Sequence, residues 1–156
     1  MMPKSLLRHK DSTSTMDDLT TGAFQPILDD PASPDPKKVK RVVFCTGKVF
    51  FDLTAGREER GTDNVALVRI EEHYPFPWTE TEAILKKYGE TEVCWVQEEP
   101  QNMGSWDFME PKLRKLLNNK GSVRYIGRRP TAATATGVQK VHQAEQQEIV
   151  ETSLDV

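Results

Sequence analysis

Four short runs of β-branched and aromatic residues alternate with four amphipathic stretches in this 156-residue chain. The runs that predict strands are 41–45, 64–71, 92–96 and 123–126, and the stretches that predict helices are 49–60, 80–88, 103–117 and 138–153. Strands that alternate with helices form a mostly parallel sheet, because each right-handed crossover returns the chain to the same end of the sheet. The pattern therefore predicts an α/β protein, a three-layer α/β/α sandwich.

Capping residues and prolines set the expected ends of these elements. Gly61 follows the first helix as a C-terminal cap. Thr79 and Glu82 predict a capping box at the start of the second helix. Pro100 has no N–H to continue a ladder after the third strand, and Pro111 is expected to break or kink the third helix. In the last helix, the residues expected to face the core are Val141, Ala144, Ile149 and Val150.

Residues 1–40 differ from the body, residues 41–156. They are expected to form an extended connecting arm, a linker from a preceding domain that this chain lacks. Several prolines after residue 25 disfavour regular structure, although Phe24, Ile27 and Leu28 suit a short edge strand docked on the core. A disordered tail is the alternative for the same residues.

Charge and hydropathy exclude several classes of function. The formal net charge of -3 provides no basic face for nucleic acid. No apolar run reaches the roughly 18 residues that a membrane-spanning helix needs. Cys45 and Cys94 lie in predicted strands and are expected to be buried thiols. The three histidines lack the spacing of metal ligands, and no nucleophile motif is present, so the sequence predicts neither a catalytic residue nor a metal site.

The most polar part of the predicted sheet follows the third strand. Gln97, Glu98 and Glu99 come after an apolar run, and a tryptophan lies on either side of the stretch. Because the carboxyl ends of parallel strands meet at one edge, this stretch should lie near the Gly47-Lys48 turn and Arg128-Arg129. The turn also opens a helix, whose free N–H groups favour an anion. The alternative is a solvated loop between two core tryptophans.

Several longer motifs resemble a known family. They are Phe44-Cys45-Thr46-Gly47-Lys48-Val49, Arg69-Ile70-Glu71 with Pro75-Phe76-Pro77, Trp95-Val96-Gln97-Glu98-Glu99-Pro100-Gln101-Asn102-Met103-Gly104, and Gly127-Arg128-Arg129-Pro130 with Ala135-Thr136-Gly137. Over essentially its whole length the chain resembles the carboxyl-terminal domain of the E1 component of 2-oxoglutarate dehydrogenases. Residues 3–9 resemble the segment that enters this domain from the preceding one.

The resemblance implies a third domain like the carboxyl-terminal domain of transketolase, with a five-stranded mixed sheet. Since the pattern accounts for four strands, the arm or the tail should supply the fifth. Such enzymes use thiamin diphosphate and magnesium, held between two earlier domains, so no cofactor and no catalytic group is expected in this chain alone.

The implied partners are the rest of the E1 chain, its homodimer mate and the E2 dihydrolipoyl succinyltransferase. The implied location is cytoplasmic in a bacterium, or the mitochondrial matrix in a eukaryote. Some relatives also bind acetyl-CoA as an activator. The residues expected to form an acyl-CoA or anion site are Thr46, Gly47, Lys48, Gln97, Gly104, Ser105, Arg128 and Arg129.

Two other hypotheses remain open at this point. The first is a free-standing acyl-CoA or nucleotide sensor that uses Lys48, Gln97 and Arg128. The second is a docking module that binds a partner chain through Trp106, Phe108 and the proline-aromatic turn.

Overall fold

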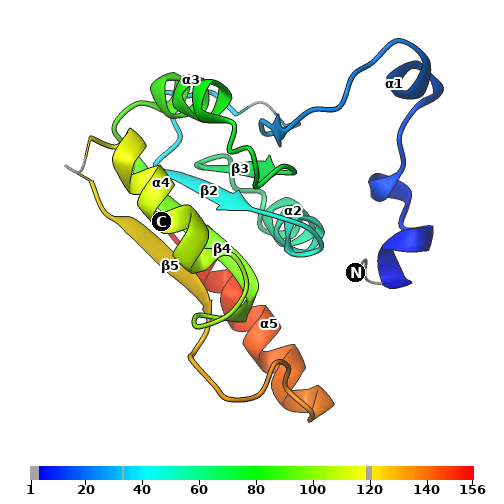
Figure 1. The fold of residues 1–156 in the computed structure, drawn as a ribbon. Helices are drawn as coiled ribbons and strands as arrows, with labels where there is room; N and C mark the ends of the chain where they lie inside the picture. The colour runs from blue at the N-terminus through cyan, green and yellow to red at the C-terminus, as the bar shows by residue number, and fades with distance from the viewer. Residues whose placement is uncertain (1–3, 33, 119–120) are drawn as a thin grey trace.

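A computed structural model describes residues 4–32, 34–118 and 121–156 (Figure 1). Met1–Pro3 and Ser33 of the predicted arm lie outside the described residues. The strands are β1 (Ile27–Leu28), β2 (Arg41–Cys45), β3 (Val65–Ile70), β4 (Glu92–Pro100) and β5 (Val123–Arg128). The α-helices are α1 (Met16–Thr20), α2 (Val49–Arg60), α3 (Trp78–Tyr88), α4 (Trp106–Leu116) and α5 (Gln139–Leu154), and the 3-10 helices are η1 (Lys4–Arg8) and η2 (Lys10–Ser12).

The five strands form one sheet in the order β1-β3-β2-β4-β5. Strands β3, β2, β4 and β5 are parallel, and only β1 runs antiparallel, against β3. The fifth strand thus comes from the arm. These findings confirm the predicted α/β class and the mostly parallel five-stranded sheet, and they are consistent with a fold like the transketolase carboxyl-terminal domain. The domain boundary at residue 40 stays a prediction.

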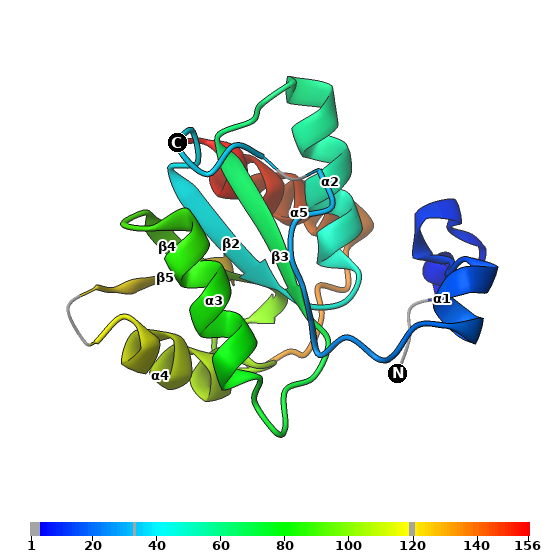
Figure 2. The same ribbon diagram turned by 90° about the horizontal axis from the view of Figure 1, so that it is seen from above.

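Helices α3 and α4 cover one face of the sheet, and α2 and α5 cover the other (Figure 2). An apolar core lies on each face. Successive residues of a strand point to opposite faces, so Trp95 packs beneath α3 and α4, whereas Val96 packs beneath α2 and α5. Strand β2 is buried along its whole length, as expected for a strand covered on both faces. The arrangement confirms the three-layer α/β/α sandwich.

The arm is fixed to the body just after β1. Asp30 is 3% exposed, and its carboxylate accepts from the Arg57 Nη2 of α2 at 3.1 Å. It also accepts from the backbone N–H of Leu67 at 2.7 Å. Strand β1 pairs with β3 only at Arg69 and Ile70. The Leu67 N–H of β3 therefore has no partner in β1, and the Asp30 carboxylate accepts its hydrogen bond instead.

The first part of the arm, residues 4–24, projects from the body on the side of α2 (Figure 1). Thr15 caps α1 through a complete capping box with Asp18. The ring of His9 lies 5.2 Å from that of Phe51 in α2, which gives the arm one aromatic contact with the body. Its large exposed apolar side chains are Leu7, Met16, Leu19 and Phe24.

Two predicted element ends are wrong. Helix α3 begins at Trp78 with Pro77 as its N-cap, and Thr79 makes no cap. In the first turn of α3, the buried Thr81 hydroxyl donates to the Pro77 carbonyl at 2.6 Å. Strand β4 continues to Pro100 because a register shift after Val96 relaxes the ladder, and bulges tolerate proline. Helix α4 continues through Pro111, so the predicted break is wrong, and the alternative of a kink stays a prediction.

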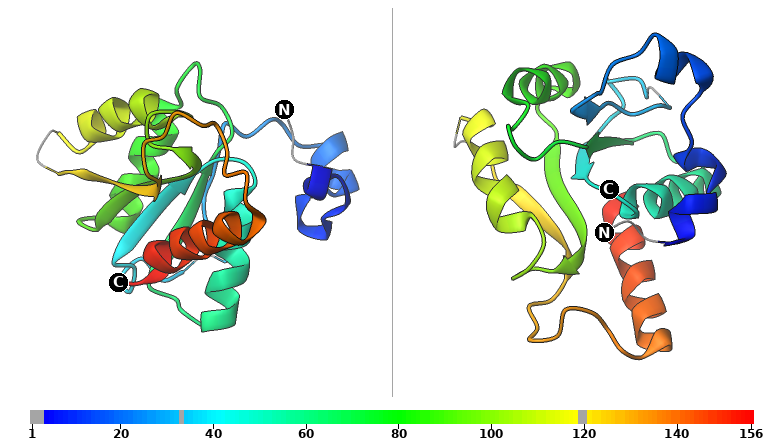
Figure 3. Two further views of the ribbon diagram at one scale, coloured as in Figure 1. Left: turned by 90° about the horizontal axis from the view of Figure 1, so that it is seen from below. Right: turned by 45° about the vertical axis from the view of Figure 1, so that its right-hand side comes forward.

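Helix α5 extends beyond the edge of the sheet (Figure 3). Its second half is packed, with Ile149 and Val150 in the core as predicted. The prediction that Val141 and Ala144 face inward is wrong, because both are exposed where the helix has no sheet beneath it. No helix within the described ranges combines the length and the apolar character needed to cross a membrane.

Candidate functional site

The carboxyl ends of β2, β4 and β5 meet at one edge of the sheet, here called the rim. These strands are neighbours in the sheet, so the turns that follow them also lie close together. The Lys48 Nζ atom donates to Glu98 Oε1 at 3.3 Å. Arg128 Nη1 donates to the backbone carbonyl of Glu98. The structure therefore brings the lysine turn, the acidic stretch and the first arginine together, as the sequence predicted.

The Lys48 ammonium is already paired with carboxylates. It donates to Asp52, one turn along α2, as well as to Glu98. Burial alone lowers the pKa of Lys48, but the hydrogen bond to Asp52 and the charge of Glu98 outweigh it, so this pKa lies above its usual value. An anion at this turn would therefore compete with two carboxylates for one cation.

Arg128 connects the rim to α5. Its side chain is 9% exposed, and its Nε donates to Glu145 Oε2 at 2.9 Å. Its Nη2 donates to Gln146 Oε1 at 3.0 Å and lies 3.2 Å from His142 Nδ1. The Thr136 hydroxyl and Arg128 hold the pKa of Glu145 below its usual value. Arg128 thus holds α5 and the loop before it against the rim.

Gln97 lies on the other face of the sheet from Lys48, beneath α4. It is 1% exposed, and its Oε1 accepts from the indole N–H of Trp95 at 2.9 Å and from the Ser105 N–H at 3.1 Å. Its Nε2 donates to the Met103 carbonyl at 2.7 Å and to the Pro100 carbonyl at 3.1 Å. All polar capacity of this amide is thus used to fix the turn between β4 and α4.

Gly104 and Ser105 belong to the same turn. Gly104 has a φ of +70°, and a Cβ there would lie 2.9 Å from the Gln97 Nε2 atom, so both backbone and space require glycine. The Ser105 hydroxyl lies 3.2 Å from His73 Nδ1, and burial lowers the pKa of that imidazole. The predicted site residues therefore form two groups on opposite faces of the sheet.

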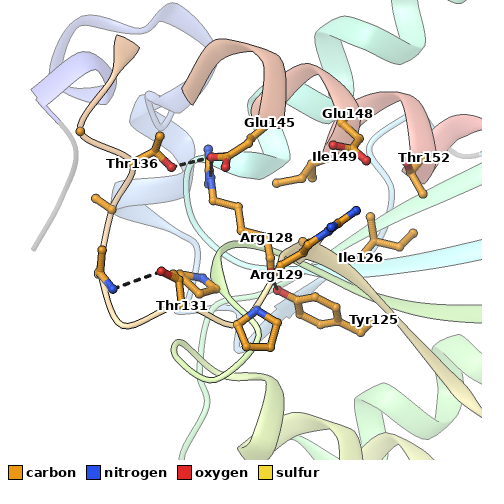
Figure 4. A pocket seen from close by; sticks show the side chains of 16 residues that line it. Tyr125, Ile126, Arg128, Arg129, Thr131, Thr136, Glu145, Glu148, Ile149 and Thr152 are labelled. Carbon is orange, nitrogen blue, oxygen red and sulfur yellow. Dashed lines mark hydrogen bonds and ion pairs between the residues drawn. The ribbon is translucent and has the colours of Figure 1, made fainter. Parts of the chain in front are cut away.

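Of the predicted residues, only Arg128 and Arg129 line the cleft of about 560 Å³ between β5 and α5 (Figure 4). Its other walls come from the loop of residues 129–137 and from Glu145, Glu148 and Ile149 of α5. The small residues of 131–137 predict a loop, and the spacing of apolar residues predicts the helix α5. Neither pattern predicts that α5 packs beside β5, so the cleft was not predicted.

The two cysteines lie within the sheet core. Cys45 and Cys94 are fully buried and unbonded to each other, as predicted. Burial raises the pKa of each thiol to about 12. Since the thiolate is the reactive form, both behave as core side chains.

Comparison of this chain with known protein sequences identifies the same family as the sequence motifs do. The model of the family described as "2-oxoglutarate dehydrogenase C-terminal" matches residues 13–154. The chain belongs to this family. It is 46% identical over 158 residues to the 2-oxoglutarate dehydrogenase E1 component of Bacillus pumilus, covering 99% of this chain and 17% of that protein. The resemblance stated from the sequence is thereby confirmed.

Other relatives in the 2-oxoglutarate dehydrogenase family also align with nearly the whole of this chain. The E1 component of an Exiguobacterium species is 43% identical over 158 residues, 99% of this chain and 17% of that protein. The mitochondrial 2-oxoglutarate dehydrogenase of Caenorhabditis elegans is 43% identical over 153 residues, 95% of this chain and 15% of that protein. The chain thus spans about one sixth of the length of these relatives.

Proposed function

We propose that this chain works as the carboxyl-terminal domain of a 2-oxoglutarate dehydrogenase E1. In this proposal the parent enzyme decarboxylates 2-oxoglutarate with thiamin diphosphate and passes the succinyl group to the lipoyl group of E2, as a step of the tricarboxylic acid cycle. The observation that carries the proposal is the alignment of 99% of the chain with an E1 component at 46% identity.

In this proposal the cofactor is held by another part of such an enzyme. Magnesium at a diphosphate takes oxygen ligands from carboxylates, phosphates and water. Within the described residues, no group of three or more histidine, cysteine, aspartate and glutamate side chains is placed to hold a metal ion. The role proposed for this domain is to supply structure and contacts.

The proposed partners are the rest of the E1 chain, a second E1 subunit and the E2 succinyltransferase. Two features support contacts beyond this chain: the exposed apolar residues Leu7, Met16, Leu19 and Phe24 of the arm, and the exposed start of α5. The proposed location is the bacterial cytoplasm or the mitochondrial matrix, since the relatives include bacterial proteins and one named as mitochondrial.

A chimera tests the proposed function. The segment of the Bacillus pumilus enzyme that aligns with this chain is replaced by this chain. Because the two sequences are 46% identical over this domain, we expect the chimera to form the parent oligomer and to decarboxylate 2-oxoglutarate within about tenfold of the parent rate. The measurement is 2-oxoglutarate-dependent reduction of ferricyanide.

The control is the same enzyme without the aligned segment, which should be inactive. A chimera that folds with the parent's oligomeric state but shows no more turnover than the truncated enzyme would contradict the proposal. Tight binding of thiamin diphosphate by the 156-residue chain alone would contradict the assignment of the cofactor to another part.

We propose in addition that the rim binds an acyl-CoA. The supporting observation is that Lys48 and Arg128 both donate to Glu98, Lys48 to its side chain and Arg128 to its backbone carbonyl, so two cations lie beside one residue. Because carboxylates already pair with these cations, we expect weak binding. Millimolar CoA should raise the melting temperature by mass action, and the Lys48→Ala, Arg128→Ala double variant should lose this shift.

Lys86→Ala is the control, since Lys86 is 71% exposed on α3, away from the rim. An unchanged melting curve of the wild-type chain in CoA would refute the acyl-CoA proposal. It would leave the E1 assignment intact, because the two rest on different observations.

A further inference from the structure

The cleft between β5 and α5 adjoins the rim, with which it shares Arg128. Its volume of about 560 Å³ is within the range of ~300–1,000 Å³ typical of small-molecule sites. The end of β5 and the loop of residues 129–137 form one side, and α5 forms the other (Figure 4). The cleft is therefore large enough for a small ligand held between two elements.

Four charged side chains line the cleft, and two of them are already paired. Arg128 and Glu145 form an ion pair at 2.9 Å, and Glu145 also accepts from the Thr136 hydroxyl at 2.6 Å. Arg129 and Glu148 line the same cleft. Within the part of the chain that the structure describes, neither forms an ion pair or a side-chain hydrogen bond. These two groups are available to a ligand.

The available charges come from opposite walls. In Figure 4 the Arg129 side chain extends from the β5 side toward α5, and Glu148 projects from α5. Ile126, 4% exposed, and Ile149, 3% exposed, also line the cleft and connect its wall to the apolar core. The cleft thus combines one cation, one anion and an apolar wall.

We propose that this cleft binds a small zwitterion, an α-amino acid with an apolar side chain. The Arg129 guanidinium suits the ligand carboxylate, because its planar fork can donate two parallel hydrogen bonds. The Glu148 carboxylate accepts from the ligand ammonium, and the side chain packs on Ile126 and Ile149. A simple anion would be repelled by Glu148, and a simple cation by Arg129, so the pair selects a ligand that carries both charges.

Three matched probes test the selection by charge. L-leucine carries both charges, 4-methylpentanoate lacks the ammonium, and L-leucinamide lacks the carboxylate. With the 156-residue chain at neutral pH, we expect L-leucine to raise the melting temperature and to shift the backbone amide signals of Gly127 and Thr136. The two single-charge probes should bind at least about tenfold more weakly, since each loses a charge-assisted contact.

Substitutions locate the binding. Arg129→Gln and Glu148→Gln remove one charge each, and both residues are exposed, so both variants should fold and bind L-leucine at least about tenfold more weakly. Arg124→Gln, in β5 but outside the cleft, and Lys48→Ala, at the rim, should bind it normally.

The proposal is overturned if either single-charge probe binds as well as L-leucine, or if Arg129→Gln retains the wild-type affinity. It is also overturned if L-leucine binding is lost in Lys48→Ala, because the ligand would then belong to the rim. Each of these outcomes is independent of turnover in the chimeric E1.

Discussion

Asp30→Ala should cost about 3–5 kcal/mol of folding free energy, the typical effect of breaking a buried ion pair. The Asp30 side chain is fully buried and the Arg57 side chain is 7% exposed. Removing the carboxylate leaves the Arg57 guanidinium as a buried, uncompensated charge, although it keeps its hydrogen bond to the Val65 carbonyl at 3.2 Å. It also leaves the Leu67 N–H without its acceptor. Urea unfolding, followed by tryptophan fluorescence, measures the loss.

Two comparisons separate the buried charge from other effects. Asp63→Ala removes an ion pair with Lys38 whose side chains are 68% and 61% exposed, and it should destabilise the fold far less than Asp30→Ala, because solvent screens the pair. Asp30→Leu with Arg57→Met removes both charges and should recover part of the loss, because an apolar pair fits a buried site. A double variant as unstable as Asp30→Ala would show that the Leu67 N–H, rather than the charge, dominates.

The strands and helices of residues 41–156 could be predicted because each has a local cause. A continuous apolar run predicts a strand that is buried on both faces, as β2 is. A glycine in the left-handed region ends α2 at Gly61, which has a φ of +61°. Such signals act within a few residues and are readable without the fold.

The wrong predictions have other causes. Thr79 has the residue type of an N-cap, but the helix already begins at Trp78, with Pro77 as its N-cap. Val141 has the helical spacing of a core residue, but α5 extends beyond the sheet at that point (Figure 3). For Val141 the local pattern is sound, and its exposure depends on what the rest of the chain places nearby.

The predicted site residues also include some whose position could be predicted from the sequence and some whose contacts could not. Parallel topology brings Lys48, Glu98 and Arg128 to one rim, and this could be predicted from the strand order. Strand alternation also turns Gln97 to the other face from Glu98, which separates the two groups. The pairing of Lys48 with Asp52 depends on side-chain packing, so the amount of free positive charge could not be read from the sequence.

Gln97→Leu should lower the free energy of unfolding by about 2–4 kcal/mol. The buried Trp95 indole N–H and the Ser105 N–H both lose their acceptor, and an unsatisfied buried donor costs about 1–3 kcal/mol. Leucine is close in size to glutamine, so the change is mainly one of polarity. The turn at residues 101–105 should also loosen, because the Met103 carbonyl loses its donor. Urea unfolding measures the first effect, and amide hydrogen exchange at Ser105 measures the second.

Gln147→Leu provides the matched control, since Gln147 is exposed on α5 and its side-chain amide donates to the Glu151 side chain at 2.9 Å. Its effect should be within about 0.5 kcal/mol. If Gln97→Leu were equally mild, the amide would not be what holds the β4–α4 turn. The result bears on the rim as well. Because the Gln97 amide is already saturated by protein groups, a variant at this position that weakens ligand binding at the rim would act through the turn, whereas a Lys48 variant can report direct contact.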